Sequence, residues 1–276
     1  SRSLEEGGAA MTFWSHGRRA TRAQDEPAPT GPSVMIIGGS NAQSYGVPDA
    51  DTFAFLLGRR FPDARFENFG TGGYSTVQAS LLAARALGSF YGARKPNLIL
   101  LGFDDSHVAR NVADQSWVFS ISDPEGRYVA PPHFRINDGA AVFHPFRTIG
   151  FWPLEKQSAA VTVLHNVWLQ SFAYNTAQQG PAVTRDTIDG LRKIAANEGI
   201  DFAVAVLEDR SQVTPGLLDG LNVPVIDCSA PGRERPAEFL LDGGSHPNAR
   251  LHAFFADCLT PFLDAYIGNR SARGTP

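Results

Sequence analysis

The sequence predicts a three-layer α/β/α sandwich built on a mostly parallel five-stranded sheet. From residue 33 onward, apolar runs of strand length alternate with amphipathic segments, which is the pattern of parallel strands connected by helices. One run, NLILLG at residues 97–102, is apolar almost throughout, as in a central strand that is buried on both faces. The chain has 276 residues, of which 43% are hydrophobic, so it can bury a substantial core.

Five runs are expected to form the strands, and the segments between them show helical spacing. The expected strands are VMIIG (34–38), RFENF (65–69), NLILLG (97–102), DFAVAVL (201–207) and VPVIDC (223–228). The expected helices cover residues 52–61, 76–87, 155–174 and 185–198, and a last helix starts after Pro247. Proline suits a first helical turn because the N–H that it lacks would be unpaired there.

The domain organisation follows from where this alternation starts and where it is interrupted. Residues 1–32 are rich in Arg, Glu, Gly, Ala and Pro without a sustained period, which predicts an irregular tail or linker. A single domain is expected over residues 33–270, with an insertion at about 112–153. The insertion holds many aromatic residues, so we expect it to pack over the edge of the sheet where ligands bind. The alternative is that it only covers an apolar end of the sheet.

Charge and cysteine content exclude several classes of protein. The net charge is −4, and no stretch concentrates enough Lys or Arg to neutralise several phosphates, so nucleic acid is not an expected partner. No run of eighteen apolar residues occurs, so no membrane span is expected in this chain. Cys228 and Cys258 lack a metal-binding spacing; we expect buried thiols, and a single bridge between them is the alternative.

The stretch VMIIGGSN turns abruptly from a buried strand into Gly38, Gly39, Ser40 and Asn41. Ligands bind at the carboxyl ends of strands in open parallel sheets, where glycines let the chain turn sharply. Such a turn can present the Ser40 hydroxyl and the following amides to a substrate. The competing interpretation is a plain glycine-rich turn in which Ser40 caps a helix.

Two more strand ends carry unusual residues. NFGTGGYST (68–76) follows the second strand, and Gly73 could bring its N–H close to a ligand. GFDD (102–105) places Asp104 and Asp105 directly after the central strand. Carboxylates there can bind a metal or hydroxyl groups, or they can cap the next helix.

A fourth feature lies far along the chain, in LLDGGSHPNARLH (240–252), where Asp242 and His246 precede the last helix. A neutral imidazole can take a proton from a serine hydroxyl, and a carboxylate at its other nitrogen orients the ring. A lone histidine is more often structural. Here an acid precedes it, a helix follows it, and its loop is predicted at the same edge as Ser40.

Together these four blocks and their order resemble the SGNH (GDSL-like) hydrolase family from about Val34 to the C-terminal helix. The resemblance implies a flavodoxin-like α/β/α fold without metal or cofactor, and hydrolysis or transfer of acyl groups, often acetyl groups on carbohydrates. It implies the catalytic residues Ser40, His246 and Asp242. It also implies oxyanion or substrate-binding positions at Gly73, Asp104, Asn41 and Asp105.

The sequence departs from the family pattern at three places. The acid before the nucleophile is replaced by Gly39, and the side-chain oxyanion donor, normally Asn, is replaced by Asp104. An ionised carboxylate there would repel the charge that develops on a substrate oxygen. Asp242 precedes His246 by four residues, a longer spacing than usual.

Two functions are therefore carried forward. The first is a serine-dependent ester hydrolase or O-acyltransferase that acts on a small-molecule ester or an acylated carbohydrate. The second is a catalytically degenerate domain that binds a carbohydrate or a protein partner. The chain starts at Ser1 rather than Met, so an export signal or anchor could have been removed, and family habit favours an exported or periplasmic location. Compartment and oligomeric state stay open.

Overall fold

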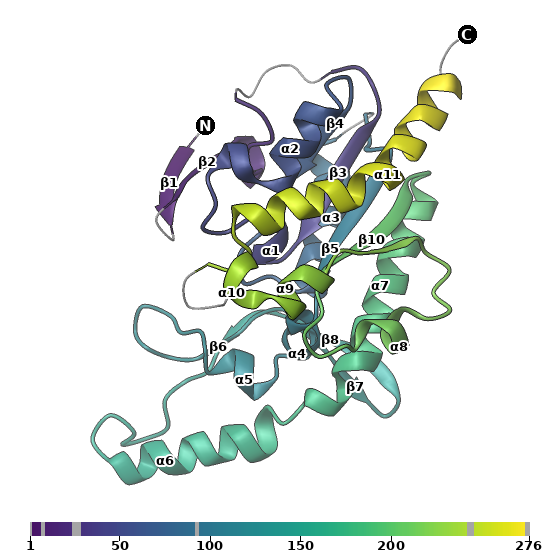
Figure 1. Cartoon of the computed structure of the whole chain (residues 1–276). Coiled ribbons are helices and arrows are strands. Elements are labelled where there is room, and N and C mark those ends of the chain that lie inside the picture. Colours follow the sequence, from purple (N-terminus) through teal and green to yellow (C-terminus); the bar gives the residue numbers. More distant parts are fainter. Residues whose placement is uncertain (1, 7–8, 24–28, 92–93, 242–245, 274–276) are drawn as a thin grey trace.

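The computed structural model of the chain describes residues 2–6, 9–23, 29–91, 94–241 and 246–273. Its centre is a five-stranded parallel sheet in the order β11-β10-β5-β3-β4 (Figure 1). The strands are β3 (Ser33–Gly38), β4 (Arg65–Asn68), β5 (Leu98–Asp104), β10 (Asp201–Glu208) and β11 (Val225–Asp227). Counted from β3, this is the 2-1-3-4-5 order of flavodoxin-like sheets. The predicted fold class is confirmed, and each strand lies within two residues of its predicted ends.

Helices cover both faces of the sheet. The four that do so are α2 (Phe53–Arg60), α3 (Thr76–Ser89), α7 (Gly180–Asn197) and α11 (Ala249–Arg273). Along β3, Val34 and Ile36 pack into the core beneath α2 and α11, whereas Met35 and Ile37 pack into the core beneath α3 and α7. All four side chains are fully buried, because successive residues of a strand point to opposite faces and both faces are covered.

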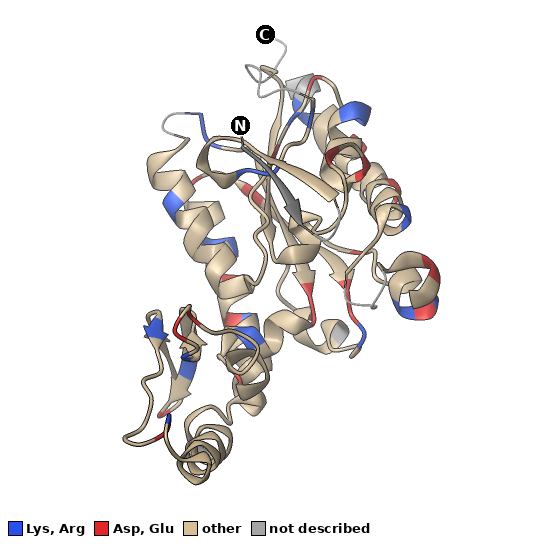
Figure 2. Cartoon of the chain, turned by 90° about the vertical axis from the view of Figure 1, so that its left-hand side faces the viewer, with Lys and Arg blue, Asp and Glu red and all other residues tan. Residues whose placement is uncertain are grey.

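Shorter helices follow the strands near their carboxyl ends. These are α1 (Ser40–Gln43), α4 (Ser106–Asn111), α8 (Thr214–Leu218), α9 (Ala230–Glu234) and α10 (Pro236–Phe239). Three strands end in an acidic residue, namely Asp104, Glu208 and Asp227, and Figure 2 shows acidic residues at this end of the sheet. None of the described helices combines the length and the apolar character that a membrane span requires.

The chain between α4 and α7 lies outside the sheet, in the same region as the carboxyl ends of the strands (Figure 1). Its elements are α5 (Gln115–Val118), β6 (Val129–Ala130), β7 (His133–Asn137), β8 (Ala140–His144), β9 (Arg147–Thr148) and α6 (Ala159–Trp168). Strands β7 and β8 form an antiparallel hairpin, and β6 pairs with β9. The helix expected at 155–174 is shorter, since it starts at Ala159 and ends in a π-helical turn over Leu169–Ala173.

The N-terminal residues are structured, so the predicted irregular tail is wrong for this part of the chain. Strand β1 (Arg2–Glu6) pairs antiparallel with β2 (Ala9–Phe13). The chain then reaches the edge of the main sheet, where the Arg19 N–H donates to the Asn68 carbonyl at 2.8 Å. This contact attaches the segment to the end of β4.

Contacts made by arginine side chains explain why the N-terminal segment packs although its sequence has no regular hydrophobic spacing. The Arg18 guanidinium lies 2.8 Å from the buried Glu67 carboxylate and 5.7 Å from the centre of the Trp14 ring. Trp14 and Met11 are themselves buried. Ion pairs and cation–π contacts of this kind leave no regular spacing in a sequence.

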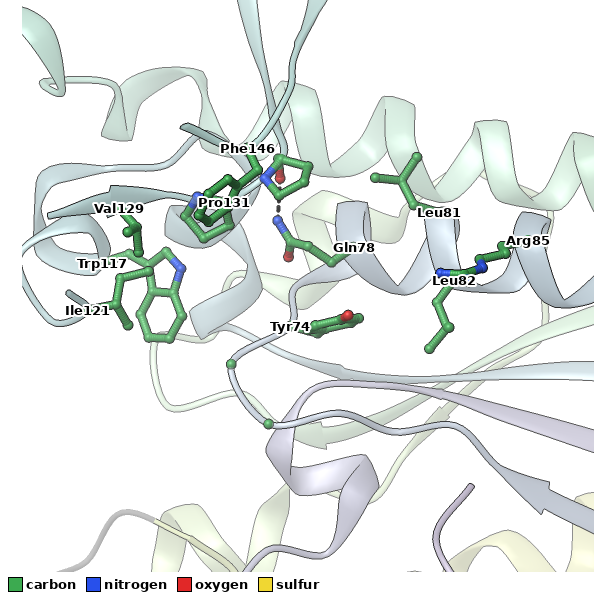
Figure 3. Close-up of a pocket in the computed structure, with 13 residues that line it drawn as sticks. Tyr74, Gln78, Leu81, Leu82, Arg85, Trp117, Ile121, Val129, Pro131 and Phe146 are labelled. Atoms are coloured by element: carbon green, nitrogen blue, oxygen red, sulfur yellow. Dashed lines mark hydrogen bonds between the residues drawn. The ribbon is translucent and has the colours of Figure 1, made fainter. Parts of the chain in front are cut away.

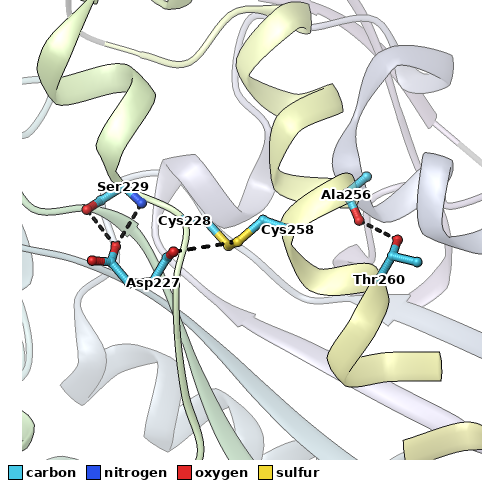
Figure 4. Close-up of a disulfide and its surroundings, with 6 residues drawn as sticks. All are labelled: Asp227, Cys228, Ser229, Ala256, Cys258 and Thr260. Atoms are coloured by element: carbon cyan, nitrogen blue, oxygen red, sulfur yellow. Dashed lines mark hydrogen bonds between the residues drawn. A yellow bond between two sulfur atoms is a disulfide. The ribbon is translucent and has the colours of Figure 1, made fainter. Parts of the chain in front are cut away.

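The two cysteines form a disulfide, so the expectation of free buried thiols is wrong. Cys228 directly follows β11, and Cys258 lies on α11 (Figure 4). The bond links the edge of the sheet to the helix that follows the His246 loop.

Candidate active site

Ser40 stands at the carboxyl end of β3, as the first residue of α1. Two glycines make the turn possible. Gly38 has φ of +146°, and a β-carbon on it would lie 2.4 Å from the Gly102 carbonyl oxygen of the neighbouring strand. A β-carbon on Gly39 would lie 2.8 Å from the Tyr74 carbonyl oxygen. The backbone is therefore packed too closely for any side chain just before Ser40.

Ser40 and His246 meet across 206 residues of sequence. The His246 Nε2 lies 3.0 Å from the Ser40 Oγ, within hydrogen-bond distance. The His246 ring also lies against Tyr45, with 4.8 Å between ring centres. The loop is held near its base, because the Leu241 N–H donates to the His246 carbonyl at 2.8 Å. The structure therefore brings the predicted nucleophile and base together.

The protonation state of His246 suits a base. Burial lowers the pKa of His246, and the charges of Arg110 and Arg210 lower it further, while Asp104 acts in the opposite direction. The pKa lies below its ordinary value, so the ring is neutral at neutral pH. With its proton on Nδ1, the ring can accept the serine proton at Nε2. The third predicted member of this group, Asp242, lies outside the described residues.

The loop after β4 lies beside the nucleophile. The Thr71 N–H donates to the Gly38 carbonyl at 3.0 Å, which holds this loop against the Gly38–Gly39 turn. Gly73 has φ of +77°, a left-handed conformation that favours glycine. Among the described residues, the backbone N–H groups of Ser40 and Gly73 have no acceptor. Both are available to a substrate oxygen, as an oxyanion site requires.

Asp104 ends β5 and is buried, with 3% of its surface exposed. Its carboxylate accepts a hydrogen bond from the Ser106 hydroxyl and lies 3.2 Å from the His107 Nε2. Burial alone would raise the pKa of Asp104, but His107, Arg110 and Ser106 together outweigh burial and hold that pKa well below its usual range. Asp104 is therefore ionised at neutral pH, and it cannot donate a hydrogen bond as Asn would.

His107 fills the space that an acid at residue 39 would need. A β-carbon on Gly39 would lie 2.8 Å from the His107 Nε2 and 3.4 Å from the Asp104 Oδ2. On its other side, the His107 Nδ1 lies 3.2 Å from the Thr76 hydroxyl. A buried Asp104–His107 pair therefore stands directly beside Gly39.

The remaining two predicted residues have structural partners. Asn41 is buried and its amide donates to the Glu208 carboxylate at 2.8 Å, which ties α1 to the end of β10. Asp105 accepts a hydrogen bond from the Ser211 N–H at 2.8 Å and so fixes the loop after β10. In both contacts the partner of the side chain is a residue other than Ser40. No group of three or more potential metal ligands lies within the part of the chain that the structure describes.

Arg110 and Trp117, which the sequence analysis did not single out, lie beside the Asp104–His107 pair and contact each other. The Arg110 guanidinium stacks 4.3 Å from the centre of the Trp117 ring, and its Nη1 lies 3.4 Å from the Tyr74 carbonyl oxygen. Its charge acts on both Asp104 and His246. The spacing of Asp104 and His107, three residues apart where a strand passes into a helix, was a signal for the buried pair; nothing in the sequence marks Arg110.

Comparison with known proteins supports the fold. No protein-family model and no curated protein matches the sequence. Among solved structures, TesA shares 11% identity and has a TM-score of 0.51, with 84% of this chain and 97% of that chain covered. A member of the lipolytic protein G-D-S-L family from Veillonella parvula DSM 2008 shares 12% identity, with 84% and 97% covered and a TM-score of 0.46. The psychrotrophic esterase EstA from Pseudoalteromonas sp. shares 10% identity, with 86% and 98% covered and a TM-score of 0.48. The strand order and the match to TesA show that this chain has the α/β/α fold of the SGNH hydrolases.

Proposed function

We propose that the protein is a serine-dependent ester hydrolase or O-acyltransferase that acts on an acyl ester, acylated carbohydrates included. The observation that carries this proposal is the 3.0 Å contact between the Ser40 Oγ and the His246 Nε2 at the carboxyl end of the sheet. A serine hydroxyl is a weak nucleophile until a neighbouring base takes its proton, and His246 is neutral and in position to do so.

In the first half of the reaction, the Ser40 Oγ forms a bond to the acyl carbon as its proton passes to the His246 Nε2. The negative charge that develops on the carbonyl oxygen is stabilised by the N–H groups of Ser40 and Gly73. The bond to the leaving oxygen then breaks, and the imidazolium returns its proton to that oxygen, so that an alcohol departs.

In the second half, water, or an acceptor hydroxyl in a transferase, attacks the acyl-Ser40 ester. His246 takes one proton from the incoming oxygen as that oxygen bonds to the acyl carbon. The bond between the acyl carbon and the Ser40 Oγ then breaks and His246 gives the proton to that Oγ, so a carboxylic acid, or a new ester in a transferase, leaves the free enzyme. Asp242 keeps its proposed role, in which its carboxylate orients the imidazole and stabilises its charged form.

A second candidate function, a binding module without turnover, is favoured by one observation. Asp104 is ionised and stands where the family has an amide donor. A lost oxyanion donor alone lowers the rate by about 10²- to 10³-fold. A domain with this change could keep its cleft for a carbohydrate or a protein partner.

Labelling with a fluorophosphonate probe separates the two functions. We expect covalent modification of wild-type protein at Ser40, identified by peptide mapping, and release of p-nitrophenol from p-nitrophenyl acetate. Ser40→Ala, which removes one hydroxyl, should lose both while keeping the thermal midpoint of the wild type. Folded wild-type protein that neither reacts with the probe nor cleaves the ester would overturn the enzyme assignment in favour of the binding module.

A further inference from the structure

A pocket of about 540 Å³ lies directly beside the loop that carries Gly73 (Figure 3). Gly72, Gly73 and Tyr74 form part of its wall, and Trp117 contacts the position of a Gly73 β-carbon at 3.5 Å. The pocket therefore adjoins Gly73, one of the two residues whose N–H groups are assigned to the substrate carbonyl oxygen.

The rest of the wall is predominantly apolar and comes from two parts of the chain. Helix α3 contributes Leu81 and Leu82, and the segment between α4 and α7 contributes Trp117, Ile121 and Val129. Figure 3 shows Trp117, Ile121 and Val129 together on one side and the residues of α3 on the other. The wall is held together, because the Gln78 amide of α3 donates to the Pro132 carbonyl.

The geometry of the reaction decides which half of an ester can occupy this pocket. His246 must protonate the leaving oxygen, so the alcohol half lies on the side of His246. Neither His246 nor its neighbour Tyr45 lines the pocket, whereas Gly73 does. The group attached to the carbonyl carbon on the other side, the acyl group, is the part of the substrate that points toward the pocket.

We propose that this pocket binds the acyl group of the substrate, and that the protein prefers esters of apolar acyl groups several carbons long, or aromatic ones, over acetyl esters. This inference rests on the proposed function. A volume of about 540 Å³ lies in the range of pockets that hold drug-sized ligands, far larger than an acetyl group requires. Each methylene that moves from water to an apolar wall makes the binding free energy more favourable, whereas an acetyl group contacts almost none of that wall.

A chain-length series tests the inference. With p-nitrophenyl esters from acetate to octanoate, kcat/KM of the wild type should rise about two- to fourfold for each added methylene, until the pocket is full. Ile121→Trp, which fills the pocket from its wall, should remove this rise with chain length. The matched control is Ile194→Trp on α7, at a half-exposed position that does not line this pocket, and it should keep the wild-type profile.

The outcomes separate the inference from the proposed function. A wild type that prefers acetate, with an Ile121→Trp profile like its own, would overturn the acyl pocket and leave the esterase standing. Leu81→Trp, at a helix position that is 43% exposed, repeats the test should Ile121→Trp fail to fold. If no ester is cleaved, the proposed function fails. Equilibrium dialysis with radiolabelled octanoate then tests whether the pocket binds an acyl chain. Binding to wild type that is lost in the Trp variants supports the pocket, and absence of binding to wild type overturns it.

Discussion

Two histidines of this protein, His107 and His246, lie near the turn that precedes Ser40, and they differ in their burial and in the groups that they contact. His107 is fully buried, three residues from its partner Asp104, and locked between that carboxylate and the Thr76 hydroxyl. His246 is only partly buried and reaches Ser40 from 206 residues away. His107 contacts a buried carboxylate, whereas His246 contacts the hydroxyl group of Ser40.

The comparison shows that a histidine close to Ser40 is not for that reason alone a catalytic base. His107 would touch the β-carbon of any residue at position 39, yet its Nε2 lies 3.2 Å from the Asp104 carboxylate and its Nδ1 lies 3.2 Å from the Thr76 hydroxyl. Burial and nearby cations lower the pKa of His246, so its ring is neutral at neutral pH and can accept a proton at Nε2. We therefore assign His246 to the reaction and His107 to the support of the turn.

The largest effect is expected when the two histidines are replaced in parallel. His246→Gln should lower kcat/KM by about 10³-fold or more and change the free energy of unfolding by less than about 1 kcal/mol. His107→Gln should lower the free energy of unfolding by about 1–3 kcal/mol, because it removes the buried contacts of the imidazole with the Asp104 carboxylate and the Thr76 hydroxyl. Urea denaturation and ester hydrolysis measure the two quantities. Equal loss of activity in both folded variants would remove the distinction between them.

The second effect concerns how each histidine is held in place. His107 is positioned by the continuous chain from β5 into α4, whereas His246 precedes α11, which the Cys228–Cys258 disulfide links to the sheet. Replacing both cysteines by serine should lower the free energy of unfolding by about 3–4 kcal/mol, as expected for a closed loop spanning 30 residues.

Below the lowered melting temperature, this double variant should keep kcat/KM within about threefold, because the Ser40–His246 contact does not include either sulfur. The single variants Cys228→Ser and Cys258→Ser serve as controls for an unpaired thiol. A double variant as stable as the wild type would mean that the bond contributes nothing to holding α11.

The central strands and the tight turn before Ser40 could be predicted from the sequence for a physical reason. A strand that is covered on both faces must be apolar at every position, so β3 and β5 stand out as continuous runs. The glycines before Ser40 are required because a β-carbon on Gly38 would collide with the Gly102 backbone and one on Gly39 with the Tyr74 backbone. The continuous apolar runs therefore located the turn, and the helix that starts after Pro247 located the loop of His246 beside it.

Other features could not be predicted because they depend on packing between distant segments. The position of the Asp104–His107 pair beside Gly39 depends on how the end of β5 packs against the turn after β3. The N-terminal segment packs through Arg18 and Glu67, and such contacts have no period to detect. Disulfide pairing likewise depends on the distance between β11 and α11, which spacing in the sequence does not determine.

A smaller effect is expected from Asp104→Asn, which tests how the paired acid acts on the site. The amide removes a negative charge near the developing oxyanion and can donate to it, so we expect kcat/KM at pH 8 to rise about tenfold. Asp104 also raises the pKa of His246, so its loss should move the acidic limb of the pH–rate profile to lower pH.

Asp104→Glu is the matched control, since it keeps the charge and should show neither change. A folded Asn variant that loses most of its activity would mean that the carboxylate takes part in the reaction itself. Asp104 would then act in the reaction, as His246 does, rather than support the turn, as His107 does.

The smallest effect should come from Arg110, the cation that both histidine sites share. Burial is the first cause of the lowered pKa of His246, and Arg110 is the next. Because a nearby positive charge disfavours the imidazolium, Arg110→Gln should raise the pKa of His246 and move the acidic limb of kcat/KM to higher pH, with little change on the plateau. Arg110→Lys keeps the charge and should leave the limb in place, while Arg210→Gln, which removes a more weakly acting cation, should shift it less. The limb is measured between pH 5 and 8 with one ester at constant ionic strength, since salt screens such charges. A limb that moves equally in the Lys and Gln variants would show that Arg110 acts through its stacking on Trp117 and not through its charge.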